Sequence, residues 1–261
     1  MSEPETADDF FALAEERYED ENLEDAIKNY NNAVKVNPSF EDAYFNRAFA
    51  KDELGDKKGA INDFSEVIRI NPNNADAFNL RGLLKYNTGN LDESIKDLKS
   101  AIKIDPNHSY AFFNLGDVLY DKDCIDEAID YLSRALQIDP NIQNAYRTRS
   151  WAYGRQDNYQ AAINDCKKII EIDPNNGESY QQLGIFQITI KDCHSALQNL
   201  TKSIELFSDE VEQEYELSDS YKYRGDIHQI MGDRSNACSD WKKSAELGDE
   251  DAAKLLEEHC Q

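Results

Sequence analysis

Four arginines and four aspartates recur in this sequence at a fixed spacing that allows them to pair. In each case the aspartate follows the arginine by sixteen residues, as residue 63 follows residue 47. The planar guanidinium group matches a carboxylate and can form two parallel hydrogen bonds with it. Such pairs could grip a ligand or could hold two elements of the protein together. The set comprises Arg47, Arg81, Arg149 and Arg224 with Asp63, Asp97, Asp165 and Asp240.

Residue patterns typical of catalysis are missing from the sequence. Its 11 glycines and 4 histidines form no phosphate-binding glycine loop, HExxH motif, EF-hand loop or GxSxG turn. Cys193 and His194 are adjacent, but neighbours along a chain do not form a nucleophile and base pair. We therefore predict a protein that is not an enzyme and that uses no cofactor or metal ion.

The spacing of the prolines indicates which elements position the arginines and aspartates. Five of the 6 prolines, Pro38, Pro72, Pro106, Pro140 and Pro174, lie 34 residues apart. A fixed period of this length indicates a repeated pair of elements. In each period an aromatic residue at the fourth place opens one helical stretch, and a small residue at the twentieth place lies in a second. Turn signals such as LGD and NTGN separate the two stretches, and proline ends the second one.

This pattern resembles the tetratricopeptide repeat (TPR) family over roughly residues 7 to 247. The family's aromatic, Leu-Gly, Ala and Pro places are occupied by Phe112, Leu115, Gly116, Ala128 and Pro140, and the fit departs at Leu119 and Leu132. The resemblance implies an all-α, right-handed α-solenoid (superhelix) of seven helix pairs with a C-terminal capping helix. It also implies a concave groove, lined by the first helix of each pair, that binds peptide segments or partner helices. The ending ACSDWKKSAELGDEDAAKLLEEHC resembles bacterial repeat proteins.

The period divides the chain into seven repeats and two end segments. Residues 1–6 form an acidic N-terminal tail, and residues 249–261 form the capping helix. The sixth repeat contains seven additional residues, 211–217, and we predict that its second helix runs on through them, because one apolar face continues to Tyr215. This acidic extension, residues 208–219, could also contact a second partner. The repeats are 7–40, 41–74, 75–108, 109–142, 143–176, 177–217 and 218–248.

The repeats explain the arginine and aspartate pairs. Each arginine is the seventh residue and each aspartate the twenty-third residue of the second, third, fifth or seventh repeat. The remaining repeats have neither charge and contain Leu13 with Asn29, Leu115 with Tyr131, and Leu183 with Asn199. Because the two charges occur only together, we predict structural ion pairs between the two helices of a repeat, and no role in ligand binding.

Helix geometry and the resemblance together define the predicted groove. In the first four repeats its residues are Leu83 together with aromatics, amides and carboxylates. Asparagine suits a partner's backbone because an amide both donates and accepts. In the fifth repeat two arginines flank Trp151, and these residue types often dominate interfaces. Alternatively, Trp151 packs against the next repeat and the arginines are solvated. The predicted groove residues are Phe11, Phe45, Asn46, Phe49, Asn79, Leu83, Tyr86, Tyr110, Phe113, Asn114, Asp117, Tyr120, Arg147, Trp151 and Arg155.

Charge restricts the kind of partner. With 28 basic and 52 acidic side chains, the formal net charge is −24. Such a surface repels phosphate backbones, so we predict no nucleic-acid partner and favour another protein that contributes a basic or apolar segment. No stretch approaches the roughly 18 apolar residues that span a bilayer, and the start lacks the features of a secretory signal. We therefore predict no membrane partner and a cytoplasmic location.

The five cysteines are odd in number and contain no CxxC spacing, which is typical of reduced thiols. Antiparallel packing about Asp249 would nevertheless bring Cys238 close to Cys260 and permit a disulfide.

Taken together, these features predict a non-catalytic adaptor or scaffold that binds a peptide segment or partner helix in its groove. Two alternatives remain open. The protein could be structural and self-assemble as a homo-oligomer through its ends or convex face, or it could be the regulatory subunit of an enzyme on another chain. The fold by itself names no partner.

Overall fold

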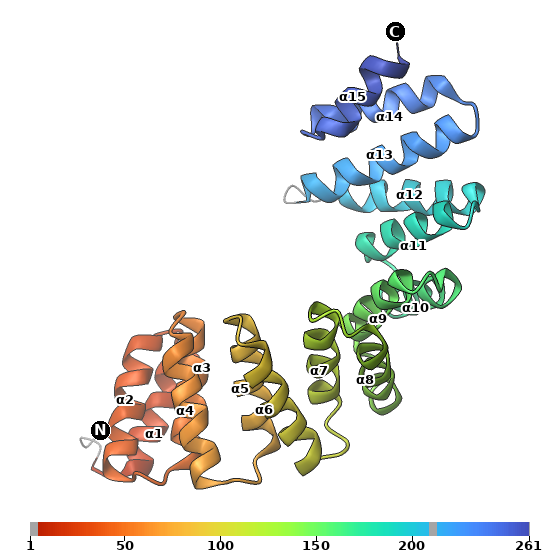
Figure 1. Cartoon of the computed structure of the whole chain (residues 1–261). Helices are drawn as coiled ribbons and strands as arrows, with labels where there is room; N and C mark the ends of the chain where they lie inside the picture. Colours follow the sequence, from red (N-terminus) through yellow and green to blue (C-terminus); the bar gives the residue numbers. More distant parts are fainter. Residues whose placement is uncertain (1–4, 209–212, 261) are drawn as a thin grey trace. The chain divides into compact units, whose positions relative to one another are not determined.

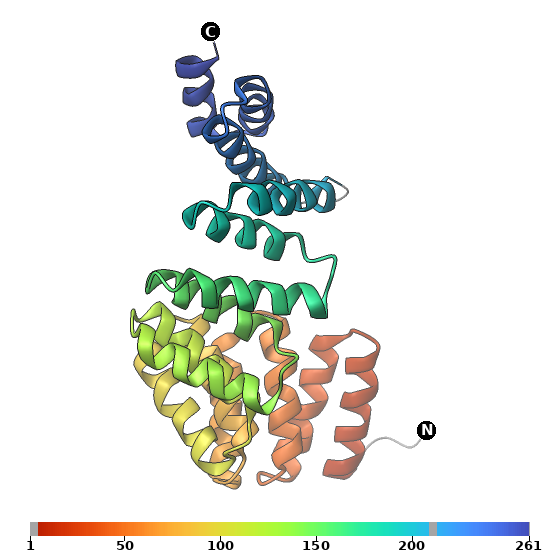
Figure 2. The same cartoon turned by 90° about the vertical axis from the view of Figure 1, so that its right-hand side faces the viewer.

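The computed structural model describes residues 5–208 and 213–260, and every regular element in these ranges is an α-helix (Figure 1). The predicted all-α fold is confirmed. The chain divides into two compact units, Met1–Ile138 and Asp139–Gln261, called the N-terminal body and the C-terminal body. Within each body, helices that follow one another along the chain pack together (Figure 2).

The described part of the N-terminal body contains four helix pairs. In each pair the first helix has 13 residues and the second has 14. The first helices of the third and fourth pairs are also in contact with each other. The helices are α1 (Ala7–Glu19), α2 (Leu23–Val36), α3 (Glu41–Glu53), α4 (Lys57–Ile70), α5 (Ala75–Asn87), α6 (Leu91–Ile104), α7 (Ser109–Asp121) and α8 (Ile125–Ile138).

The described part of the C-terminal body contains three helix pairs and a final helix. Its elements are α9 (Gln143–Arg155), α10 (Tyr159–Ile172), α11 (Gly177–Thr189), α12 (Cys193–Phe207), α13 (Glu214–Ile230), α14 (Arg234–Glu246) and α15 (Glu250–His259). The final helix, α15, packs on α14. No described helix of either body combines the length and the apolar character needed to cross a membrane.

Each of the five regularly spaced prolines ends a second helix by restricting the backbone of the residue immediately before it. A proline ring disfavours the helical conformation for the residue before it and favours an extended one. Asn37 accordingly has φ −123° and ψ 94°, and Asp173 has φ −132° and ψ 96°. Two of the five helices that follow these prolines begin with an asparagine cap. The side-chain oxygen of Asn74 accepts a hydrogen bond from the backbone N–H of Ala77 at 2.9 Å, and that of Asn176 accepts one from Ser179 at 2.9 Å. The 34-residue period is thus a repeated stop and start signal.

Small residues allow the two helices of a pair to approach closely. The residues at the twentieth place of the seven repeats are completely buried, and they are Ala26, Ala60, Ser94, Ala128, Ala162, Ala196 and Ala237. Opposite them, a Cβ atom on Gly116 would lie 2.6 Å from Leu132 Cγ, and one on Gly225 would lie 2.7 Å from Trp241 Cδ1. Glycine is therefore needed at these two positions because a large side chain of the partner helix fills the space.

The predicted extension of the second helix of the sixth repeat is wrong. α12 ends at Phe207, and the Ser208 hydroxyl donates a hydrogen bond to the Ile204 carbonyl at this end. Tyr215 lies in α13 and is 75% exposed. The apolar spacing that suggested one continuous buried face therefore does not correspond to a buried side chain at this position. Residues 214–217 of the insertion instead belong to the next first helix, α13, which has 17 residues. Val211, with its acidic neighbours Glu210 and Glu212, lies outside the described residues, as do residues 1–4 of the acidic tail.

A disulfide joins α14 to the end of α15. Cys238 and Cys260 are bonded, with Cα atoms 5.7 Å apart, whereas Cys124, Cys166 and Cys193 are free. The interpretation of all five cysteines as reduced thiols is therefore wrong for this pair. Disulfides persist mainly in oxidising compartments and are rare in the cytosol. This bond therefore disagrees with the predicted cytoplasmic location.

Candidate groove on the first helices

Each predicted arginine and aspartate pair forms in the structure. Arg47 Nε donates to Asp63 Oδ2 at 2.8 Å, and Arg47 Nη2 donates to Asp63 Oδ1 at 2.6 Å. The same two-point contact joins Arg81 to Asp97, Arg149 to Asp165 and Arg224 to Asp240, with distances of 2.7 or 2.8 Å. The four carboxylates are between 3% and 5% exposed. These side chains therefore join the two helices of a repeat in its interior.

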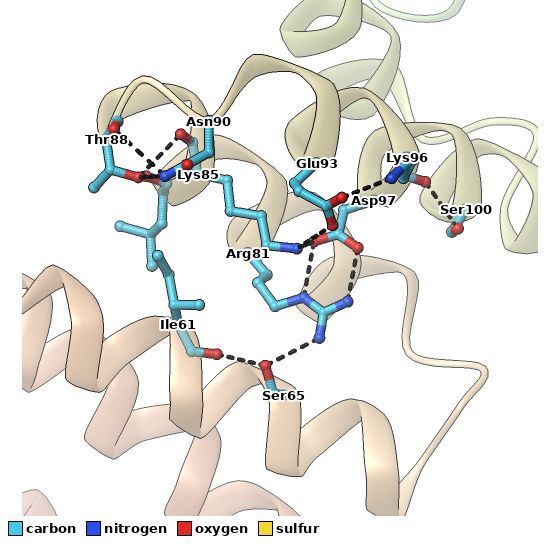
Figure 3. A network of polar contacts seen from close by, with 11 residues as sticks. Ile61, Ser65, Arg81, Lys85, Thr88, Asn90, Glu93, Lys96, Asp97 and Ser100 are labelled. Carbon is cyan, nitrogen blue, oxygen red and sulfur yellow. Dashed lines mark hydrogen bonds and ion pairs between the residues drawn. The ribbon is translucent and has the colours of Figure 1, made fainter.

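A third contact of the guanidinium group reaches the preceding repeat. Arg47 Nη1 donates to Asn31 Oδ1 at 2.7 Å, and Arg81 Nη1 donates to Ser65 Oγ at 3.0 Å (Figure 3). Arg224 Nη1 reaches Thr201 Oγ1 at 3.3 Å. Sequence reasoning missed these partners, although a polar residue at the twenty-fifth place of the preceding repeat marks all three of them. Arg47, Arg81 and Arg224 thus also link consecutive repeats.

Aromatic rings at the fourth place cover the same guanidinium groups. The Arg47 Cζ atom lies 5.0 Å from the centre of the Tyr44 ring, and the corresponding distance from Arg81 to Phe78 is 5.5 Å. A lysine completes the cluster on α3 and on α5, because Lys51 Nζ is 2.7 Å from Asp63 and Lys85 Nζ is 2.8 Å from Asp97 (Figure 3). The arginine and the lysine of α3 therefore both contact the buried Asp63 carboxylate, and those of α5 both contact Asp97.

The first helices of the N-terminal body form an open pocket of about 630 Å³ between α3, α5 and α7. Nine of the predicted groove residues line it: Phe45, Phe49, Asn79, Leu83, Tyr86, Tyr110, Phe113, Asn114 and Asp117. Four further residues complete the lining, and they are Asp76, Leu80, Asn87 and His108. Leu80 and Asn87 are the sixth and thirteenth residues of their repeat, so helix periodicity could have included them. His108 precedes its helix, and periodicity gives no signal for it.

Ordered hydrogen bonds hold the polar side chains of this pocket. Asn114 Nδ2 donates to Asn79 Oδ1 at 2.9 Å, and both side chains are buried. The Tyr86 hydroxyl donates to Asp121 Oδ2 at 2.5 Å. Burial, followed by this hydrogen bond, raises the pKa of Tyr86. His108 Nδ1 accepts from the backbone N–H of Ala111 at 3.2 Å.

The remaining predicted groove residues of the N-terminal body have other surroundings. Asn46 donates to Glu15 at 2.9 Å beside a smaller pocket of about 160 Å³. The Phe11 ring packs on Phe40, with ring centres 5.0 Å apart, and so contributes to the core between repeats. Tyr120 is half-buried and does not line the larger pocket.

The three predicted groove residues of the C-terminal body lie on α9. The Trp151 ring meets the Phe186 ring of the next repeat at 5.6 Å and stays 40% exposed. Arg147 Nη2 is 3.3 Å from Glu178. The ring thus packs on the next repeat, as the alternative interpretation expects, and a role of its exposed part in binding stays a prediction. Arg155 is the last residue of α9.

Comparisons with known structures show the same fold. A C-terminal part of a TPR repeat-containing protein from Cytophaga hutchinsonii is 20% identical, with a TM-score of 0.76, and the alignment covers 94% of this chain and 99% of that one. YrrB, described as a TPR protein with an unusual peptide-binding site, is 17% identical with a TM-score of 0.65, and 75% and 97% are covered. MamA from Desulfovibrio magneticus is 22% identical with a TM-score of 0.61, and 66% and 97% are covered. No curated protein matches the sequence.

Family models give the assignment. The TPR repeat model matches residues 14–55, 51–89 and 82–123, and tetratricopeptide repeat models match residues 109–142 and 143–176. TPR proteins mediate protein–protein interactions and are typically non-catalytic, and no catalytic family was identified. Because these matches together span residues 14–176, more than half of the 261 residues, the chain belongs to the tetratricopeptide repeat family.

Proposed function

We propose that this chain is a non-catalytic adaptor that binds a segment of another protein in the pocket between α3, α5 and α7. The observation that carries the proposal is the exposure of large apolar side chains around one cavity. The Phe49 side chain is 36% exposed and that of Tyr110 is 54% exposed, although both line the same pocket. Contiguous exposed apolar surface typically marks an interaction site.

The size and the polar groups of the pocket suit a peptide. Its volume of about 630 Å³ falls within the range of roughly 300–1,000 Å³ that ligand pockets commonly have. The amides of Asn79 and Asn114 lie among the apolar residues, and amides can bond both the N–H and the C=O groups of a peptide backbone. A peptide-binding site is also part of the printed description of YrrB, one of the solved structures with this fold.

Self-assembly through the C-terminal end is the less favoured alternative. α15 covers the last helix pair there, with Ala252 buried and Leu255 and Leu256 packed against the cluster around Trp241. Its opposite side is charged and exposed at Glu250, Asp251, Lys254, Glu257 and Glu258. A terminal helix of this kind removes the apolar face on which a second copy would stack.

Affinity capture from a lysate of the source organism, read by mass spectrometry, tests the proposal. The binding variant combines Phe49→Ala with Leu83→Ala. The matched control combines Val36→Ala with Leu54→Ala, which removes two apolar side chains that are 53% and 45% exposed outside the pocket. Each buried side chain of this kind contributes about 1.5–3 kcal/mol, so the binding variant should weaken capture by more than tenfold.

The control variant is expected to capture the same proteins as the wild type. Equal capture by all three proteins would show that binding occurs elsewhere on the surface and would overturn the proposal. Circular dichroism of each variant checks that the helix content is unchanged.

A further inference from the structure

We propose that the segment bound in this pocket contains apolar side chains flanked by arginine or lysine. This inference rests on the proposed function and specifies the chemistry of the occupant. It follows from the distribution of charge along the helices that form the pocket.

The centre of the pocket is apolar. Phe45 and Phe49 lie on the middle turns of α3, with ring centres 5.3 Å apart, and both rings also meet Phe64 edge to face. Leu80 and Leu83 lie on the middle turns of α5 and line the same space. This surface can only be covered favourably by apolar groups of an occupant.

Carboxylates occupy both ends of the same helices. Asp42 and Asp76 lie in the first turns of α3 and α5, and the Asp76 side chain is 73% exposed. At the opposite ends, Glu53 and Asp121 are the last residues of α3 and α7, and each accepts a hydrogen bond from a tyrosine of the preceding first helix. Asp117 also lines the pocket.

The basic side chains of α3, α5 and α7 do not offset this charge at the pocket. Lys51 and Lys85 contact Asp63 and Asp97 in the interior pairs, and neither lines the pocket. α7 (SYAFFNLGDVLYD) contains no lysine or arginine. Among the described residues that line the pocket, the only basic type is His108, whose Nε2 lies 3.1 Å from Asp76. The local potential is therefore negative, which attracts cations.

Other occupants fit this distribution less well. An acidic segment would bring like charges together, which disfavours binding. A wholly apolar segment would take water from the bordering carboxylates without replacing it. A guanidinium group can instead bind these carboxylates and stack on the exposed ring of Tyr110.

Selection from a random 12-residue peptide library displayed on phage, with the full chain as bait, tests the inference. Enriched peptides are synthesised with a fluorescent label, and their affinities are measured by fluorescence anisotropy. The charge variant combines Asp76→Asn with Asp117→Asn. The matched control combines Glu127→Gln with Asp130→Asn, which removes two exposed carboxylates from α8 and changes the net charge equally.

We expect the enriched peptides to combine large apolar residues with arginine or lysine. Their affinity should fall at least tenfold for the charge variant and for Phe49→Ala, and less than twofold for the control. Raising the salt concentration should weaken binding to the wild type and should affect the charge variant less.

Peptides that show no excess of arginine or lysine, yet lose binding to Phe49→Ala, would overturn this inference and leave the proposed function in place. Unchanged affinity for Phe49→Ala, or a selection that enriches no peptide, would overturn the proposed function as well. Equal losses for the charge variant and the control would show a general effect of net charge and would also overturn the inference.

Discussion

Replacing Arg47 by leucine should destabilise α3 and α4 without altering the pocket. The substitution leaves the Asp63 carboxylate, which is 3% exposed, without its two-point partner. It also removes the donor to Asn31, 2.7 Å away on the preceding repeat. Leucine is a conservative choice because Leu13, Leu115 and Leu183 occupy the same place in other repeats of this chain.

The expected magnitude follows from what remains around Asp63. Breaking a buried ion pair by removing one partner costs about 3–5 kcal/mol. Lys51, at 2.7 Å, still neutralises the carboxylate in part, so we expect about 3 kcal/mol. Arg69→Leu is the matched control, since Arg69 forms a pair with Glu66 on the surface, and exposed pairs of this kind contribute under about 1 kcal/mol.

Adding Asp63→Asn should restore part of the lost stability. The repeats with leucine at the seventh place carry Asn29, Tyr131 or Asn199 at the twenty-third, and none carries a carboxylate. Because Asn has no charge to leave unpaired, the double variant should recover at least about 1.5 kcal/mol relative to the sum of the single variants.

Native-state hydrogen exchange of the backbone amides of α3 and α4 measures the change in local stability for each variant. A local measurement is suitable because the stability of a repeat protein is approximately the sum of the stabilities of its repeats and of the interfaces between neighbouring repeats. A loss for Arg47→Leu no larger than for Arg69→Leu would refute the reasoning. So would loss of peptide affinity at unchanged stability, because it would place Arg47 in the binding site.

Two further predictions concern the C-terminal body. Cys238→Ser combined with Cys260→Ser opens a loop with a sequence separation of 22 residues, so α15 should lose about 3 kcal/mol of protection from hydrogen exchange, and unchanged protection would contradict a stabilising role. Burial raises the pKa of Asp226, whose side chain accepts a hydrogen bond from Trp241 Nε1 at 2.9 Å. The folded state therefore binds the proton of Asp226 more tightly than the unfolded state does. The free energy of unfolding consequently falls as pH rises above the ordinary pKa of 3.8. Asp226→Asn should therefore be more stable than the wild type at neutral pH in thermal unfolding and should lose this advantage below about pH 4, whereas an advantage that grows on acidification would contradict the assignment.

The predicted groove shows which surface residues the sequence periodicity can identify and which it cannot. Phe45, Phe49 and Leu83 could be assigned to one surface because their helices repeat every 34 residues and each helix presents the same places. Phe11 has the same place in its repeat as Phe45, yet it packs on Phe40. Periodicity identifies a face of a helix, but the packing of the folded chain decides whether a side chain on that face is covered.

The sixth repeat illustrates the opposite error. Leu200, Ile204 and Phe207 form a true buried face, and the same spacing continues by coincidence to Tyr215. Tyr215 lies in α13 and is 75% exposed, so apolar spacing beyond Phe207 does not mark a buried face.

The sequence by itself determined the repeat length, the helix pairs and the matching of Arg47 with Asp63, because these depend on local signals and on identical places recurring in each repeat. Only the tertiary structure decided three other features: the contact from Arg47 to Asn31, the disulfide of Cys238, and the apolar pocket with acidic ends. The reason is that each of these depends on packing beyond the helix pair of a single repeat, whereas the Arg47 and Asp63 pair forms within one.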